Sequence, residues 1–264
     1  MELGYIISGF AVGMLVGITG VGGGSLMTPL LVFLFGFKAA VAVGTDLLYA
    51  AITKTGGVFV HHNSHKSVDW RVVGWMSLGS LPSAVATIFL IKHLINIDKD
   101  ITGLITFTLG IALILTSVAL LIRSYLTRKK IREIEDSVIS SGRFKTMQIP
   151  ATILTGIMLG TLVTISSVGA GVLGTLALLF LYPKTSTLKV IGTDLAHAIP
   201  LTAVAGFGHW TLGHVGFTLL GTLLIGSLPG IWIGSHLSVK IPEKVLRPIL
   251  ATLLLIIGLK FVLA

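Results

Sequence analysis

Eight long hydrophobic stretches, separated by short polar segments, dominate the pattern along this chain. They fall at about residues 3–36, 39–60, 72–91, 101–122, 149–181, 190–208, 215–235 and 245–262. The fourth, Ile101–Ile122, contains no charged residue. About 20 apolar residues in a helix, at about 1.5 Å each, are enough to cross the hydrocarbon core of a bilayer. The pattern therefore predicts an all-α integral membrane protein with several membrane-embedded helices.

The first and fifth stretches are too long for one straight crossing. A straight helix over residues 3–36 would measure about 50 Å, whereas the hydrocarbon core is about 30 Å thick. Each of the two stretches contains a cluster of glycine and small polar residues near its middle, at residues 17–25 and 163–171. We therefore expect both stretches to be broken at these clusters.

One long polar segment, residues 123–148, separates the fourth stretch from the fifth. It contains seven Lys or Arg residues and three Asp or Glu residues. Because Lys and Arg collect in cytoplasmic loops, the segment is predicted to be a basic cytoplasmic linker. It divides the chain into a first transmembrane repeat, residues 1–122, and a second, residues 149–264.

The two sides of the linker share short motifs at a nearly constant spacing. Gly-Thr-Asp-Leu at residues 44–47 recurs 148 positions later at 192–195. Gly-Ser-Leu-Pro at residues 79–82 recurs 147 positions later at 226–229. The sequence therefore predicts two homologous halves of four hydrophobic stretches each.

Internal duplication is the usual construction of secondary transporters, in which the binding site lies at the interface of the repeats. If every stretch crosses the membrane, the halves are parallel and both termini are cytoplasmic, which is the simpler expectation. If each broken stretch folds back to the side on which it began, the halves are inverted and the N terminus lies outside. The sequence leaves both arrangements open.

Composition narrows the class of protein further. Only 11% of the 264 residues are charged and 53% are hydrophobic, whereas an average soluble domain has about 25% charged residues. This excludes a soluble enzyme and a disordered protein, and the absence of Cys excludes a disulfide scaffold and thiol chemistry. The formal charge of +9 is explained by the bias of cytoplasmic loops, so the lipid bilayer, not nucleic acid, is the expected surrounding.

Ionisable side chains inside hydrophobic stretches are costly and mark functional sites. The two aspartates of this kind are equivalent by the repeat, and each follows a threonine. They are predicted to line the pathway or to carry a coupling proton. Each has a structural alternative: the aspartates accept hydrogen bonds at a helix start, and the lysine extends to the membrane interface. The residues expected on the pathway are Asp46, Asp194, Lys54, His197, Thr45 and Thr193.

The two glycine-containing clusters indicate an anion site. Unwound backbone at membrane depth leaves N–H groups free, and this is tolerated only inside the protein or along a wet cavity. A half-helix that begins there directs its positive dipole end and its N–H groups into the interior, where they can bind an anion. Close helix packing is the alternative role of the glycines. The residues expected to bind substrate are Thr19, Gly22, Gly23, Gly24, Ser25, Ser166, Ser167, Gly169, Ala170 and Gly171.

Other chemistry lacks support in the sequence. The glycines at residues 20–24 have no βαβ context for a dinucleotide site. His61, His62 and His65 have one nearby carboxylate, Asp69, so no metal site is expected. No Ser-His-Asp arrangement or HExxH motif is present, so the protein is not expected to be an enzyme. No cofactor is expected apart from a coupling ion, either a proton or sodium.

Several motifs resemble those of the TauE/SafE family of sulfite exporters. They are the glycine cluster at residues 17–25 followed by Pro29, the Ser-Val-Gly-Ala-Gly sequence at 167–171, and the paired Gly-Thr-Asp and Gly-Ser-Leu-Pro motifs. The resemblance covers nearly the whole chain except the linker. It implies a multi-pass transporter of the plasma membrane that exports sulfur-containing anions such as sulfite, sulfonates, sulfoacetate or thiosulfate. The second cluster has Gly-Ala-Gly in place of a glycine triplet, so the two sites need not be equivalent.

The sequence thus predicts a secondary transporter of a small anion that works by alternating access, with movement of one half against the other. A permease or channel for a different solute is the first alternative, and it would show flux insensitive to loss of either aspartate. A membrane-embedded enzyme or assembly factor is the second, and it would show turnover or a partner without flux. Whether the chain forms a homo-oligomer is left open.

Overall fold

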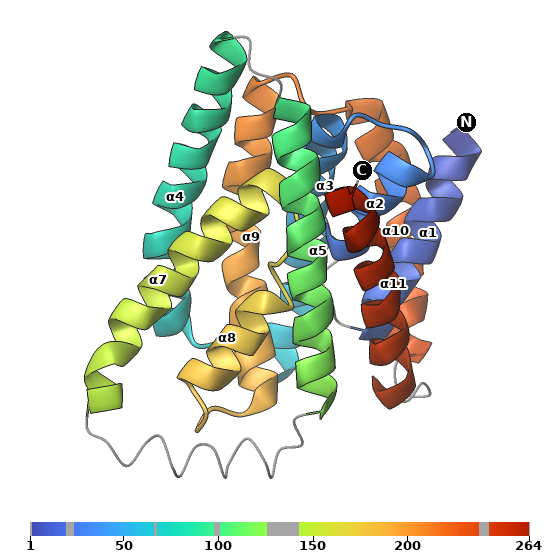
Figure 1. The fold of residues 1–264 in the computed structure, drawn as a ribbon. Helices are drawn as coiled ribbons and strands as arrows, with labels where there is room; N and C mark the ends of the chain where they lie inside the picture. The colour runs from blue at the N-terminus through green and yellow to red at the C-terminus, as the bar shows by residue number, and fades with distance from the viewer. Residues whose placement is uncertain are drawn as a thin grey trace.

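A computed structural model of the chain describes residues 2–19, 24–65, 68–97, 101–125, 143–237 and 243–263. All regular secondary structure in these ranges is α-helical (Figure 1). The helices are α1 (Glu2–Thr19), α2 (Gly24–Phe33), α3 (Ala39–His65), α4 (Trp70–Asn96), α5 (Ile101–Tyr125), α7 (Arg143–Ser166), α8 (Leu173–Leu181), α9 (Thr187–Thr211), α10 (Phe217–Leu237) and α11 (Glu243–Leu263). The all-α class predicted from the hydrophobic pattern is confirmed.

Five helical segments in the described part of the chain are long and apolar enough to cross a membrane. They are Trp70–Asn96, Ile101–Ile122, Met147–Ser166, Thr187–Thr211 and Phe217–Gly234. Shorter apolar segments, Leu3–Ile18 and Pro248–Leu263, lie in α1 and α11. Most of the predicted basic linker lies outside the described residues.

Both over-long hydrophobic stretches are broken where small residues gather. α1 ends and α2 begins within the cluster at residues 17–25, and α7 ends within the cluster at 163–171, shortly before α8 begins. In the second break Ser167, Gly169 and Gly171 have φ values of 59°, 114° and 118°. A right-handed helix cannot continue through such angles, which glycine adopts without a steric penalty. The two predicted breaks are therefore observed.

Each broken stretch also folds back on itself. In the first, the Tyr5 ring near the start of α1 packs edge-on against Phe35, just after α2, with ring centroids 4.9 Å apart. In the second, Thr152 Oγ1 in α7 lies 2.8 Å from the hydroxyl of Tyr182, which directly follows α8. The two contacts are themselves 147 positions apart at both partners. The stretches thus return to the side on which they began instead of crossing straight through.

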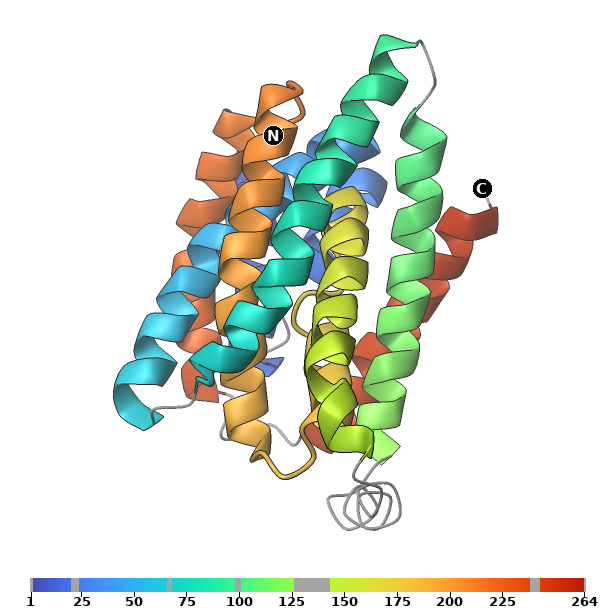
Figure 2. The ribbon, with the colours of Figure 1, turned by 90° about the vertical axis from the view of Figure 1, so that its left-hand side faces the viewer.

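The fold-back decides where the ends of the described chain lie. Figures 1 and 2 both place the start of α1 and the end of α11 at one end of the bundle, and the end of α5 and the start of α7 at the other. Eight through-going stretches would instead have put the chain ends on the same side as the linker. The positions of the chain ends correspond instead to the second alternative, in which each broken stretch folds back.

The two halves are interlocked rather than separate lobes. The most extensive helix contacts, α1 with α10, α4 with α7, α5 with α11 and α3 with α9, all join the first half to the second. Glycines allow two of these pairs to approach closely. A Cβ atom at Gly226 would overlap the carbonyl oxygen of Ile6, and one at Gly79 would overlap that of Ile153. Such small-residue contacts are typical of helix packing in membranes.

Candidate functional site

The two aspartates of the Gly-Thr-Asp motifs are buried and face the two half-helices. Asp46 and Asp194 are 0% and 1% exposed, and each lies about two turns inside its own helix, α3 or α9. Thr28 of α2 donates its hydroxyl hydrogen bond to Asp46 Oδ2 at 2.5 Å. Thr175 of α8 donates to Asp194 Oδ2 at 2.7 Å. Neither aspartate therefore caps its own helix, as one alternative from the sequence required; both point at the beginning of another.

The first turn of α8 is shaped for this close approach. Gly174 is the second residue of α8, and a Cβ atom there would overlap Asp194 Oδ1. The beginning of α2 and the break before α8 also share one buried cluster, which contains Leu26, Met27 and Val168. The two half-helices thus begin in the interior of the bundle, close to carboxylates supplied by α3 and α9.

The threonines of the same motifs connect the halves. Thr45 Oγ1 accepts a hydrogen bond from the backbone N–H of Gly216, immediately before α10, at 3.0 Å. Thr193 Oγ1 accepts one from the backbone N–H of Asp69, immediately before α4, at 2.9 Å. Each motif therefore fixes the start of a helix from the other half with its threonine and faces a half-helix with its aspartate.

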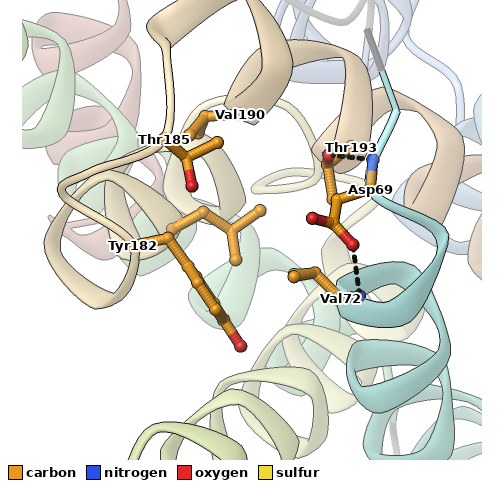
Figure 3. Close-up of a pocket in the computed structure, with 7 residues that line it drawn as sticks. Asp69, Val72, Tyr182, Thr185, Val190 and Thr193 are labelled. Atoms are coloured by element: carbon orange, nitrogen blue, oxygen red, sulfur yellow. Dashed lines mark hydrogen bonds between the residues drawn. The ribbon is translucent and has the colours of Figure 1, made fainter. Parts of the chain in front are cut away.

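The contact at Thr193 lies beside a small pocket at the linker end of the bundle (Figure 3). Asp69 caps α4 by accepting hydrogen bonds from the N–H groups of Arg71 and Val72, and its carboxylate lies 3.2 Å from Lys189 Nζ. Burial alone would raise the pKa of Asp69, but the hydrogen bond and charge of Lys189, with the two N–H groups, hold it below its ordinary 3.8. The result is an ion-paired link between α4 and α9.

Lys54 lies inside the protein and not at the membrane interface. The side chain is 6% exposed, and its ammonium donates a hydrogen bond to the carbonyl oxygen of Ala170 in the second break at 3.2 Å. Both aspartates are near enough to interact electrostatically with this ammonium. A buried ammonium of the first half is thus held by the unwound backbone of the second. The alternative in which the lysine extends to the interface does not describe this arrangement.

The contact of His197 leads to a further residue, Tyr49, that was not predicted from the sequence. His197 Nε2 lies 2.8 Å from Ser80 Oγ of the first Gly-Ser-Leu-Pro motif. The residue 148 positions before His197 is Tyr49, which is fully buried and has Ser227, of the second such motif, as its hydroxyl neighbour. The two pairs match across the halves. Applying the repeat spacing to His197 would have identified Tyr49.

The predicted substrate-binding residues differ in how far the structure describes them. Gly22 and Gly23 lie outside the described residues, as does the side chain of Thr19, whereas Gly24 is the first residue of α2. Ser25 is 4% exposed. In the second cluster, the Ser166 hydroxyl donates to the Leu162 carbonyl and accepts from the Val168 N–H, so it serves the local backbone.

Ser167 is placed differently from Ser166. Its hydroxyl is a neighbour of the Asp46 carboxylate but is buried without a hydrogen bond of ordinary geometry. The second cluster therefore meets Asp46 through Ser167 and Lys54 through Ala170. Among the predicted residues, Ser167 and Ala170 of the second half thus lie beside Asp46 and Lys54 of the first half.

A larger cavity of about 750 Å³ lies between α5, α7 and α8. Among the described residues that line it, none is ionisable; apolar side chains and three threonines form its walls. This composition suits the acyl chains of lipids and not a small anion. The buried charges around the two half-helices therefore form the candidate site.

Comparisons with known proteins agree on one family. A family profile described as sulfite exporter TauE/SafE matches residues 5–261. The chain is 36% identical over 266 residues to the probable membrane transporter protein YjnA of Bacillus subtilis, covering 99% of this chain and 100% of that protein. It is 27% identical to the probable membrane transporter protein YdhB of the same organism, over 94% and 97% of the two chains.

A third relative is archaeal. The probable membrane transporter protein MJ0441 of Methanocaldococcus jannaschii is 26% identical, over 96% of this chain and 92% of that protein. No solved structure gives a significant match. The similarity thus extends over nearly the whole chain in each of the three relatives.

Proposed function

Because this chain belongs to the sulfite exporter TauE/SafE family of membrane transporters, we propose that it moves small sulfur-containing anions, such as sulfite or organosulfonates, across the plasma membrane. Its apolar helices make it a multi-pass membrane protein. Export is the direction that the family description favours. The transport is secondary, driven by an ion gradient through either protons or sodium.

The observation that carries this proposal is the pair of half-helices that begin inside the bundle. A helix N-terminus offers free N–H groups and positive potential to an anion. In broken-helix transporters such ends bind anionic groups at the membrane midplane. The substrate site proposed here lies at the starts of α2 and α8, with Lys54 as the nearby positive charge.

The aspartates explain why the binding of an anion would be coupled to the binding of a cation. Asp46 and Asp194 face the same half-helices that would attract the anion. Two like charges close together in an interior of low dielectric repel strongly. An anion therefore binds well only when a carboxylate is neutralised by a bound cation.

Alternating access in this fold needs a different division from the one expected from sequence. The halves are interlocked through four helix pairs, so one half cannot swing as a body against the other. We propose that mixed helix pairs move instead, and that the threonine contacts before α4 and α10 break and form in turn. These contacts lie at helix starts on opposite ends of the bundle (Figure 1).

The function is tested by flux into proteoliposomes. Labelled sulfite, an organosulfonate and thiosulfate are supplied with a pH gradient, with a sodium gradient, or with neither, and chloride and acetate serve as competitors. Protein-free liposomes give the background. Gradient-driven accumulation of at least one sulfur anion supports the proposal. Flux that ignores every gradient favours a permease or channel, and no flux of any sulfur anion overturns the substrate class.

The orientation has its own test, since the chain contains no cysteine. We propose that the linker is cytoplasmic, which places the start of α1 and the end of α11 outside. Single cysteines introduced at Ser137 and at Leu263 should react with an impermeant maleimide from opposite sides of the membrane. Labelling of both from the same side would contradict the fold-back of the two broken stretches.

A further inference from the structure

The two threonine contacts that join the halves are secured by different groups. At the linker end, the contact of Thr193 with Asp69 is accompanied by the ion pair of Asp69 with Lys189. At the opposite end, Thr45 accepts its hydrogen bond from Gly216, and the repeat spacing of 147 or 148 residues replaces the ion pair with Gly216 itself and a valine. Among the described residues this opposite-end contact thus has no equivalent ion pair, and two histidines lie beside it instead.

The two histidines, His209 and His214, hold the turn between α9 and α10. Gly213 has a φ of 76° and ends α9 in a Schellman motif: the N–H of His214 donates to the carbonyl oxygen of His209 at 3.0 Å, and the N–H of Gly213 donates to that of Trp210 at 2.9 Å. An apolar contact often joins the two residues in these positions. Here their imidazole Nδ1 atoms lie 3.3 Å apart, so two titratable side chains occupy the place of an apolar pair.

This turn is fixed against the motif that contains Thr45. The carbonyl oxygen of His214 lies so close to Gly44 that a Cβ atom there would overlap it, and the Cβ of His209 is also near. Two residues after His214, the N–H of Gly216 donates to Thr45 Oγ1 at 3.0 Å. A change in the contact between the two imidazoles therefore acts directly on the opposite-end contact.

The hydrogen-bond partners assign the protons of the histidine pair. His209 Nε2 lies 2.8 Å from the carbonyl oxygen of Thr164, in the last turn of α7. A carbonyl oxygen only accepts, so this nitrogen carries a hydrogen, and Nδ1 of a neutral His209 is then an acceptor. His214 Nδ1 is therefore the donor, which leaves its Nε2 without a hydrogen. Because the His214 side chain is only partly buried, its Nε2 is the nitrogen that can take up a proton from water.

The pair also connects this contact with the proposed anion site. Thr164 lies three residues before Ser167, where the chain leaves the helix with a φ of 59°. The N–H of Val168, which would donate to Thr164 in a continued helix, donates to Ser166 Oγ instead. The carbonyl oxygen freed by the break is thus taken up by His209. Rearrangement of the break would be felt at the opposite-end contact.

A proton on this pair has no compensating charge among the described residues around it. On the helices packed against α9, the charged or titratable groups toward this end of the bundle are Lys38, Asp46, Lys92 and His93. Only Asp46 is acidic, and its carboxylate faces Thr28 of α2. The helices α7, α8 and α10 add no titratable side chain at this end. Burial accordingly lowers the pKa of His214 from its ordinary 6.5.

From this geometry we propose that the neutral pair of His209 and His214 holds the contact between Thr45 and Gly216 closed, and that binding of one proton from the aqueous phase releases it. The proton forms an N–H bond at Nε2 of His214, and no other covalent bond changes. In the closed turn the new charge is partly buried without a counter-charge, whereas an opened turn exposes it to water, so the proton favours opening. The gating role rests on the proposed function, but the proton dependence of the contact does not.

The first experiment needs no substrate. Hydrogen–deuterium exchange of the purified protein in detergent follows the N–H groups of residues 212–216, which the turn and Thr45 protect. Labelling times are scaled to the intrinsic exchange rate at each pH. Linkage to one proton changes an equilibrium by up to about tenfold per pH unit, so we expect protection to fall about fivefold between about pH 7.5 and pH 5.5.

Glutamine separates the proton from the hydrogen bond. His214→Gln keeps an N–H donor but cannot take up a proton, so its protection should be the same at both pH values. His236→Gln is the matched control, since His236 is an exposed histidine at the other end of α10, and it should behave as the wild type. Protection that ignores pH in the wild type, or that falls equally in His214→Gln, would overturn the proposal.

The second experiment uses transport. Exchange of labelled for unlabelled organosulfonate, which stays anionic over this pH range, is measured with equal pH on both sides of the proteoliposome membrane. Acceleration in acid should be larger in the wild type and in His236→Gln than in His214→Gln. Equal acceleration in all three would overturn the gating role. If no sulfur anion is carried, the proposed function fails, but the hydrogen-exchange measurement still decides whether a proton releases the contact.

Discussion

The surroundings of Asp46 and Asp194 share the same arrangement of residues, but the lysine of the first half, Lys54, has no counterpart in the second. Both aspartates lie in a Gly-Thr-Asp motif, both accept a hydrogen bond from a half-helix threonine, and both are buried. The first repeat has Lys54 where the second has Thr202, and Tyr49 where the second has His197. The shared parts hold the half-helices in place. The differing parts place a single buried lysine in the neighbourhood of two equivalent carboxylates.

Among the variants that test this comparison, substitution of Lys54 should have the largest effect on stability. Lys54→Met leaves two buried carboxylates without the nearby ammonium, so we expect a loss of about 3–5 kcal/mol in the free energy of unfolding. Adding Asp194→Asn or Asp46→Asn removes one of the two uncompensated charges and should restore part of the stability. Thermal unfolding in detergent measures both. No rescue by either second substitution would show that the loss does not come from uncompensated carboxylates.

The shared framework should respond equally in both halves. Gly226→Ala places a methyl group against the backbone of Ile6, and the equivalent Gly79→Ala places one against Ile153. Overpacking of this kind costs about 1–3 kcal/mol, and we expect the two unfolding temperatures to fall by similar amounts. Gly221→Ala is the control on the same helix as Gly226, because no atom lies within 4 Å of a Cβ there. Since alanine has the higher helix propensity, a comparable fall for Gly221→Ala would show that close packing does not explain the result.

The two half-helix threonines should have smaller effects of similar size. Thr175→Val removes a hydroxyl donor from the Asp194 carboxylate, which costs about 1.5–3 kcal/mol. Thr28→Val removes the equivalent donor from Asp46 and should cost a similar amount. Chemical unfolding of the two variants at pH 7 measures both costs. A clear difference between them would show that the two half-helices do not hold their carboxylates in equivalent ways.

The smallest effect is expected at the linker end, where the ion pair of Asp69 and Lys189 is one-third to two-fifths exposed. Asp69→Asn keeps a residue suited to capping α4 and removes only the charge, so it should cost about 0.5–1 kcal/mol at pH 7. Because the pKa of Asp69 is lowered from 3.8 in the folded protein, this stabilisation is complete above that pH. It is lost as the pH falls through the lowered value. Unfolding of both forms across this range should converge at the acid end; a difference that persists there would assign the effect to the cap instead.

Much of the fold follows from local sequence. The helices and the two breaks follow from hydrophobic length and glycine content, which act over a few residues. The fold-back does not, because it depends on contacts such as Tyr5 with Phe35 and Thr152 with Tyr182. Each joins residues about 30 positions apart through a turn whose direction no local pattern specifies.

The candidate site, like the fold, follows only in part from the local sequence. The cost of burying a charge in a membrane identified Asp46, Asp194, Lys54 and His197. It gave no information on their partners, since Thr28 and Thr175 look like ordinary residues of apolar helices. Whether Lys54 reaches the interface or the interior also depends on Ala170, more than a hundred residues away. Only the packing of the two halves decides that.

The hairpins formed by α1 with α2 and by α7 with α8 bear on how such a chain arose. A unit made of a returning hairpin and three long helices begins on one face of the membrane and ends on the other. When its gene is duplicated and fused in tandem, the second copy is inserted upside down without any additional crossing. On this account the separate unit would have entered the membrane in both directions and paired with itself head to tail. The seven basic residues of the linker would then favour a single direction for the fused chain, if the linker is cytoplasmic as proposed.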